Sequence, residues 1–354
     1  MEARYAEITA PRAARMQSAI RGLILAAIAG LVALGLSLGA APATATFPGE
    51  NGKIAFASDR TGSWEIWTMT SDGSNETKIT HSPITSESQP SFSPNGKNIL
   101  YVRAGELNCG LPSRPTCSRE IFDDTTNWTP DGWKSFANAQ PAYSPLMYGD
   151  HPQRRIVWSS TYGAAGTGAC IWTKTRAQDS PTQLTNCEGD DLRPSYSPDG
   201  RQIVFDGQPR SFNRNGRQVI VMNPNGGHET ELWQGSHATF SPDGERIAFQ
   251  TNTGCRNTGD GCGIAVIDSD GKNFQPVISP PGCCRTASTR AEYPSWSPDG
   301  TRIAYQQDND IWSVNVASCT GGSGSASPPC GRSREPLTTK GHNVQPDWGP
   351  TPHP

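Results

Sequence analysis

The sequence predicts an all-β fold, a six-bladed β-propeller with four-stranded blades. One segment built around a Ser-Pro-Asp-Gly turn recurs along the chain, and its copies are spaced 44–57 residues apart. That spacing is typical of a propeller blade made of four short strands. The chain also has 37 glycines and 30 prolines among 354 residues, which interrupt it too often for the long helices of a bundle.

The repeat is clearest in four segments, and two weaker copies complete the set. The strong copies are QPSFSPNGKNILY (89–101), RPSYSPDGRQIVF (193–205), HATFSPDGERIAF (237–249) and YPSWSPDGTRIAY (293–305). A fifth copy is split between 140–145 and 155–158, and the first keeps only its second half, 51–56. The isoleucines after the turns, at 54, 99, 156, 203, 247 and 303, are 45, 57, 47, 44 and 56 residues apart. We therefore expect six blades.

Each unit can be divided into strands and turns. A strand with an aromatic residue leads into the turn, where proline sets φ and glycine takes the positive φ. A second apolar strand follows, then a third such as 65–69, and a second glycine turn such as 71–73. The fourth strand ends in Ile-Thr or Leu-Thr, at 79–80, 184–185 and 337–338. The Asp residues beside the turn glycines, Asp199, Asp243 and Asp299, are therefore expected to serve the turns.

These segments resemble the PD40 repeats of TolB-type six-bladed β-propellers, which are related to WD40-like blades. The resemblance covers residues 47–350 and implies the same fold. Members of this group include TolB, a periplasmic protein that docks a peptidoglycan-associated lipoprotein, prolyl-oligopeptidase relatives, and some oligogalacturonate lyases. The α/β domain of TolB and the hydrolase domain of the peptidases have no counterpart in this sequence, so we expect a propeller that acts alone.

The two ends of the repeat region predict how the ring closes. The first copy lacks its aromatic strand, and the segment 345–350 (QPDWGP) supplies one. We expect it to pair with the first blade as its innermost strand, so that few strand edges are exposed. The expected organisation is a propeller over 46–350 and a tail over 351–354, with blades at 51–80 plus 344–350, 89–139, 140–185, 192–233, 236–279 and 292–338. We interpret 127–132 (NWTPDG) as a turn inside an insertion in blade two and not as a seventh blade.

The first 45 residues are predicted to be a secretory signal peptide. Arg12, Arg15 and Arg21 precede the apolar run 22–41, and Ala43-Thr44-Ala45 has the A-x-A form of a cleavage site. The alternative is an uncleaved membrane anchor, because the run approaches the ~20 residues that span a bilayer. A signal of the general secretory type predicts a secreted, periplasmic or cell-envelope protein that is not membrane-embedded after cleavage.

Ten cysteines agree with export, because disulfides form in oxidising compartments. Neighbouring cysteines suggest local bridges: Cys109 with Cys117, Cys170 with Cys187, Cys255 with Cys262, and Cys319 with Cys330. The adjacent Cys283 and Cys284 could bond to each other or exchange partners with Cys255 and Cys262. Metal binding is the competing interpretation, but the sequence has no pair of C-x-x-C motifs, and we expect no metal.

The motifs of several function classes are absent from the sequence. The formal net charge is −3, and no segment after residue 45 concentrates Lys or Arg, which disfavours nucleic-acid binding. There is no G-x-S-x-G or H-E-x-x-H motif, and Asp268-Ser269-Asp270-Gly271 lacks the later ligands of a calcium loop. We therefore expect no catalytic residues and no cofactor.

A candidate binding surface follows from the repeat geometry. The residue just before each innermost strand should lie at the mouth of the central channel, where six blades converge. These residues are Gln89, Gln140, Arg193, His237, Tyr293 and Gln345. Their polar side chains could hold a peptide end or a sugar, although a channel of this kind can be polar and water-filled without binding anything.

The sequence thus predicts an exported, non-enzymatic binding or scaffold propeller that is a monomer. Its partner would be a protein, a peptide or a cell-wall glycan. The alternative is a propeller hydrolase or lyase that acts on a polysaccharide at the channel mouth. His237 among three glutamines weakly resembles the metal site of the lyases, so a metal bound there would favour that alternative.

Overall fold

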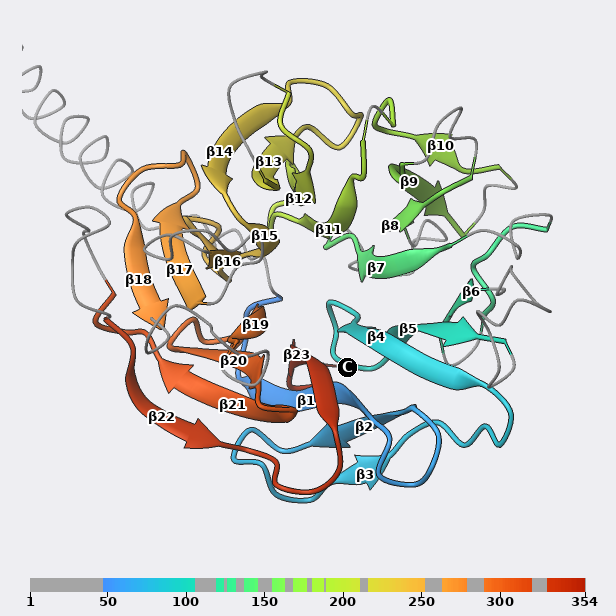
Figure 1. Ribbon diagram of the computed structural model, residues 1–354, viewed down its shortest axis with the longest axis vertical. Helices are drawn as coiled ribbons and strands as arrows, with labels where there is room; N and C mark the ends of the chain where they lie inside the picture. Colours follow the sequence, from blue (N-terminus) through green and yellow to red (C-terminus); the bar gives the residue numbers. More distant parts are fainter. Residues whose placement is uncertain are drawn as a thin grey trace, which may run out of the picture. The chain divides into compact units, whose positions relative to one another are not determined.

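The computed structural model confirms the all-β, six-bladed propeller (Figure 1). It describes residues 47–105, 119–123, 126–131, 137–145, 155–162, 168–176, 180–187, 189–210, 216–251, 263–278, 290–319 and 330–353. All of these belong to the second of two compact units, Met1–Pro42 and Ala43–Pro354, so the expected signal peptide lies outside the described residues. Within the described residues, no helix has the length and apolar character to cross a membrane.

Each blade is an antiparallel sheet whose first strand lies nearest the ring centre (Figure 1). In order from the centre outward, the blades are β23 (Asn343–Pro350), β1 (Asn51–Ser58), β2 (Glu65–Met69), β3 (Thr77–Lys78); β4 (Ser86–Phe92), β5 (Ile99–Ala104), β6 (Arg119–Phe122); β7 (Ala139–Tyr143), β8 (Arg155–Ser160), β9 (Cys170–Thr175), β10 (Thr182–Gln183); β11 (Leu192–Tyr196), β12 (Ile203–Gly207), β13 (Gln218–Met222), β14 (Thr230–Gln234); β15 (Ser236–Phe240), β16 (Arg246–Thr251), β17 (Gly263–Asp268), β18 (Gln275–Ile278); and β19 (Glu292–Trp296), β20 (Arg302–Gln307), β21 (Asp310–Asn315), β22 (Arg332–Pro336).

The repeated turns have the structural role that the sequence predicts. In the β11–β12 turn, Asp199 Oδ1 accepts hydrogen bonds from Ser197 Oγ (2.6 Å) and from the backbone N–H of Arg201 (3.0 Å). Gly200 has φ 66°, which a residue with a side chain rarely adopts. Asp243 and Asp299 make the same bonds in their own turns. These aspartates therefore stabilise turns, as expected.

The threonine of the Ile-Thr and Leu-Thr pairs connects the fourth strand to the third. Thr80 Oγ1 accepts a hydrogen bond from the N–H of Ile66 at 2.9 Å, and Thr185 and Thr338 do the same in their blades. Each bond satisfies a buried backbone donor at the start of the third strand.

The same pattern corrects the interpretation of 127–132 as a turn inside an insertion. Asn127 forms a β-bridge with Phe122, and Thr129 Oγ1 accepts from the N–H of Ile121 at 2.7 Å. Trp128 is buried and donates from its indole N–H to Asp123. This segment therefore occupies the fourth-strand position of blade two, so Asn-Trp-Thr is the counterpart of the Ile-Thr pairs.

Pairing of β23 with β1 closes the ring, as the sequence predicts. Trp348 lies opposite Ile54, and Asn343 lies opposite Ser58. The aromatic residue of each innermost strand is at most 6% exposed; these are Phe92, Tyr143, Tyr196, Phe240, Trp296 and Trp348. Each packs against apolar residues of a neighbouring blade, as Phe240 of β15 does against Val204 and Val219 of blade four. The core therefore lies between blades, and closure buries the last such boundary.

Candidate functional site

The structure brings the six predicted mouth residues together around one central cavity of about 150 Å³. Each comes from the innermost strand of a different blade: β23, β4, β7, β11, β15 and β19 (Figure 1). The sequence places them just before these strands, whereas the structure places them inside the strands. We call Gln89, Gln140, Arg193, His237, Tyr293 and Gln345 the ring residues.

The ring residues share an unusual backbone conformation. Their φ angles run from 49° to 57°, although none is glycine. In every innermost strand the pairing register shifts at this point, so the ring residue and its successor face one residue of the second strand. This is a β-bulge, which re-aims a side chain. A left-handed conformation costs roughly 1–2 kcal/mol per residue, and such strain tends to concentrate at functional sites.

A pair of substitutions at Gln140 tests this strain. Both Gln140→Gly and Gln140→Val remove the hydrogen bond that Ser159 Oγ donates to Gln140 Oε1, so their difference reports on the backbone. We expect the valine variant to be less stable than the glycine variant by at least about 1 kcal/mol, because glycine tolerates positive φ. Urea unfolding measures both. Equal stabilities would show that the bulge stores no strain.

Side-chain oxygens connect neighbouring blades around the ring. Gln345 Oε1 accepts the backbone N–H of Gln89 at 3.0 Å, and Gln89 Oε1 accepts that of Gln140 at 2.8 Å. Gln306 of β20 accepts the N–H of Gln345 at 3.3 Å. Within the described residues, the amide NH₂ groups of Gln89 and Gln345 make no hydrogen bond. These donors therefore remain for a ligand.

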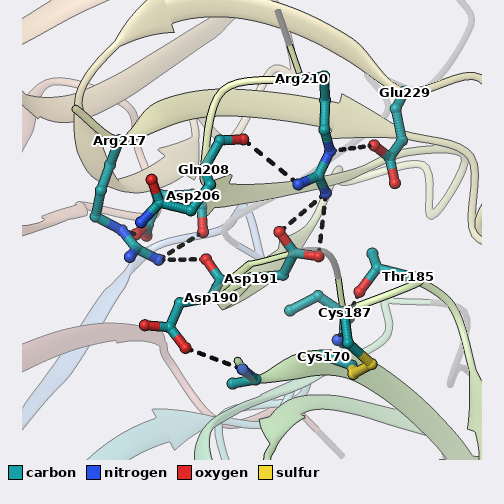
Figure 2. Close-up of polar contacts among 12 residues, drawn as sticks. Cys170, Thr185, Cys187, Asp190, Asp191, Asp206, Gln208, Arg210, Arg217 and Glu229 are labelled. Atoms are coloured by element: carbon teal, nitrogen blue, oxygen red, sulfur yellow. Dashed lines mark hydrogen bonds and ion pairs between the residues drawn. A yellow bond between two sulfur atoms is a disulfide. The ribbon is translucent and has the colours of Figure 1, made fainter. Parts of the chain in front are cut away.

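On blade four, the ring is held by an ionic network that the sequence does not reveal. Asp206 is fully buried and pairs with Arg193 at 2.7 Å and with Arg217 at 2.5 Å. Its other oxygen accepts the backbone N–H of His237 from the next blade at 3.2 Å. Figure 2 shows Arg217 also donating to the backbone oxygens of Asp190 and Asp206. Asp206 thus positions two ring residues at once.

His237 is expected to be neutral at neutral pH. Burial, and after it the charges of Arg193 and Arg217, hold the pKa of His237 well below its usual range. Its ring packs edge-on against Tyr293 with centroids 4.1 Å apart, and Nδ1 lies 3.1 Å from Ser236 Oγ. Nε2 is buried and makes no hydrogen bond within the described residues. In the same part of the chain, no group of three or more His, Cys, Asp or Glu side chains could hold a metal ion.

A second ionic cluster lies on blade four beside the first (Figure 2). Arg210 contacts both carboxylate oxygens of the buried Asp191, at 2.9 and 3.0 Å, and Glu229 at 2.9 Å. Burial raises the pKa of Asp191, and Arg210 opposes that shift. The Cys170–Cys187 disulfide ties β9 to the segment that leads to Asp191.

Two of the four suggested cysteine pairs are disulfides in the structure. Cys170 and Cys187 have Cα atoms 4.8 Å apart, and Cys319 and Cys330 have theirs 5.3 Å apart. The other six candidates lie outside the described residues; they are Cys109, Cys117, Cys255, Cys262, Cys283 and Cys284. The two bridges agree with an oxidising, extracytoplasmic compartment.

Removing the Cys170–Cys187 bridge should lower the free energy of unfolding by about 2–4 kcal/mol, as expected for a loop of 17 residues. The double variant Cys170→Ala/Cys187→Ala, measured by urea unfolding, tests this value. Cys319→Ala/Cys330→Ala is the matched comparison, with a closed loop of 11 residues and a slightly smaller expected loss. A Cys170/Cys187 variant as stable as the parent would show that the bridge contributes nothing to the fold.

The comparisons with known proteins agree on the fold. No protein-family model and no curated protein matches the chain. Among solved structures, TolB from Acinetobacter baumannii is 18% identical with a TM-score of 0.58, and the match covers 86% of this chain and 68% of that one. The fold is TolB-like. A structure described as TolB from Agrobacterium tumefaciens is 16% identical, with a TM-score of 0.51 and coverage of 83% and 91%.

The same architecture also occurs inside a larger enzyme. Hydrazine synthase from Kuenenia stuttgartiensis is 12% identical, with a TM-score of 0.58, and the match covers 88% of this chain but 48% of that one. At these identities the likeness shows the fold alone, because one propeller fold supports many functions. The function must therefore be argued from the site.

Proposed function

We propose that the protein is an exported, non-enzymatic binding module that holds its ligand at the mouth of the central channel. The observation that carries this proposal is the convergence of six strained ring residues, one from each blade, on one cavity. The amide groups of Gln89 and Gln345 and the aromatic ring of Tyr293 offer the mixture of donors and apolar surface that is typical of binding sites.

The cavity borders a second hollow that extends the proposed site. This hollow, of about 400 Å³, shares Gln89, Tyr293 and Gln345 with the first, and adds Trp64 of blade one and Glu292 of blade six. A ligand that fills both hollows would be elongated, with polar and apolar groups along its length. An extended peptide segment of a protein partner meets these requirements, and we propose it ahead of a cell-wall glycan.

The proposed compartment lies outside the cytoplasmic membrane. Two disulfides support it, because such bonds persist in oxidising compartments. The signal peptide expected over residues 1–45 would provide the export route.

A capture experiment with matched variants tests the proposed site. The purified propeller would be immobilised and exposed to envelope extract of the producing cell, with bound proteins quantified by mass spectrometry. Tyr293→Asn keeps a residue that tolerates positive φ but removes the aromatic ring, and should reduce capture of the partner at least tenfold. Lys97→Asn, in the exposed β4–β5 turn, should leave capture unchanged. Equal capture by both variants would contradict the proposed site.

A further inference from the structure

One residue of the channel breaks the repeat. The position two residues after each ring residue also lines the central cavity. In five blades it holds a small uncharged residue, and in the closing strand β23 it holds an aspartate. The six residues at this position are Ser91, Ala142, Ser195, Thr239, Ser295 and Asp347. A carboxyl group therefore stands where the fold is satisfied by serine, threonine or alanine.

Asp347 is held in place without a neutralising partner. Its Oδ2 accepts the backbone N–H of Phe92 at 2.7 Å, and Ser295 donates to the carboxylate as well. Within the described residues, no Lys, Arg or His forms an ion pair with it. Burial raises the pKa of Asp347 to about 6. Its ionised form thus costs folding stability, and unpaired buried charges are usually kept for a reason other than the fold.

The other ionisable groups around the cavity do not compensate this charge. Arg193 from β11 is paired with Asp206, His237 from β15 is held neutral by burial and the nearby arginines, and Tyr293 from β19 is a phenol. The strands β4 and β7 contribute only uncharged residues to the described lining. At neutral pH, Asp347 therefore supplies the uncompensated charge of the channel.

We infer that Asp347 recognises a protonated primary amine of the bound ligand, a lysine side chain or a peptide amino terminus. This inference rests on the proposed function, because it names the group that enters the channel. A cavity of about 150 Å³ has room for a short alkylammonium chain, since a liquid water occupies ≈ 30 Å³. A divalent cation fits less well, because Ca²⁺ takes 6–8 oxygen ligands, often several carboxylates, and Asp347 is the one unpaired carboxylate in the described lining.

A small probe tests the inference directly. n-Butylammonium chloride would be titrated into the whole protein by NMR, with n-butanol as the uncharged probe of similar size. We expect saturable binding of the ammonium, at least tenfold weaker binding of butanol, and at least tenfold weaker ammonium binding in Asp347→Asn. The control Asp299→Asn should bind as the parent does, because the equivalent turn of blade two already has Asn95. Asp347→Ser, which reproduces the residue of three other blades, should behave like Asp347→Asn.

The same titration has a defined pH dependence. With a pKa of about 6, Asp347 is about one-tenth ionised at pH 5 and almost fully ionised at pH 7.5, so binding should strengthen about tenfold between them. Melting temperatures give an independent readout. Because the folded pKa lies above the unfolded one, ionisation costs stability as pH rises from about 4 through 6. Asp347→Asn should therefore melt about 2–5 °C above the parent at pH 7.5 and with it at pH 4.

The outcomes separate this inference from the proposed function. Ammonium binding that is equal in the parent and Asp347→Asn, or absent from both, would overturn the role of Asp347. So would tighter binding of CaCl₂ than of the ammonium. If Tyr293→Asn still abolishes partner capture in that case, the binding site at the mouth stands and only its proposed selectivity fails. If capture is also unaffected by Tyr293→Asn, both proposals fail.

Discussion

Replacing Trp348 with alanine is expected to lower the free energy of unfolding by about 3–5 kcal/mol. Trp348 belongs to the strand that closes the ring and is 1% exposed. It packs with Ile54 and Phe56 of blade one and with Ala304 and Ile311 of blade six. Truncation would therefore open a cavity at the boundary where the two ends of the propeller meet.

Urea unfolding of Trp348→Ala, followed by tryptophan fluorescence and by circular dichroism, measures this loss. Trp64→Ala is the matched control, because Trp64 is only partly buried and lines the second hollow. We expect a loss for the control of less than half that for Trp348→Ala. Similar losses for the two variants would mean that closure by β23 contributes little to stability.

Replacing Asp206 with alanine is expected to lower the free energy of unfolding by about 2–4 kcal/mol. Removing one member of a buried ion pair typically costs 3–5 kcal/mol, and the partial exposure of Arg193 and Arg217, 22% and 24%, reduces that value. The variant leaves both arginines uncompensated and the backbone N–H of His237 without its acceptor. Because two ring residues lose their support, partner binding should weaken as well.

The control for Asp206→Ala is Asp199→Ala in the same blade. Asp199 serves an exposed turn through Ser197 and Arg201, and losing such local bonds should cost about 1 kcal/mol. Urea unfolding and the capture experiment would be run on both variants. If Asp199→Ala were as damaging as Asp206→Ala in both measurements, the ionic network would have no special role in the ring.

The repeat alone predicts most of the architecture. Four strands per unit, turns at Ser-Pro-Asp-Gly, and closure by the segment containing Trp348 all follow from local turn chemistry and from the missing first strand. The six ring residues could also be located, because equivalent positions in a closed ring converge on its axis. Their position inside the strands could not, since the bulge is a property of backbone pairing and leaves the Gln-Pro or Arg-Pro sequence unremarkable.

The contacts that support the ring were missed for a different reason. Asp206, Arg217 and Gln306 lie on second and third strands, where each blade has its own side chains, so the repeat does not align them with a shared role. The Asn-Trp-Thr segment of blade two was misinterpreted because Trp128 replaces the usual isoleucine or leucine. Asp347 left a visible signal, since it stands where other copies have Ser, Thr or Ala, but its place in the channel is known only from the structure.

Site-specific photo-crosslinking in the producing cell tests the central claim most directly. Benzoylphenylalanine would replace Tyr293 in one strain and Lys97 in another, and covalent adducts would be identified after irradiation. If the channel mouth holds the ligand, Tyr293 should give a discrete adduct with one partner, and Lys97, in the β4–β5 turn, should give none. Adducts from Lys97 alone, or none from Tyr293, would contradict a binding site at the mouth.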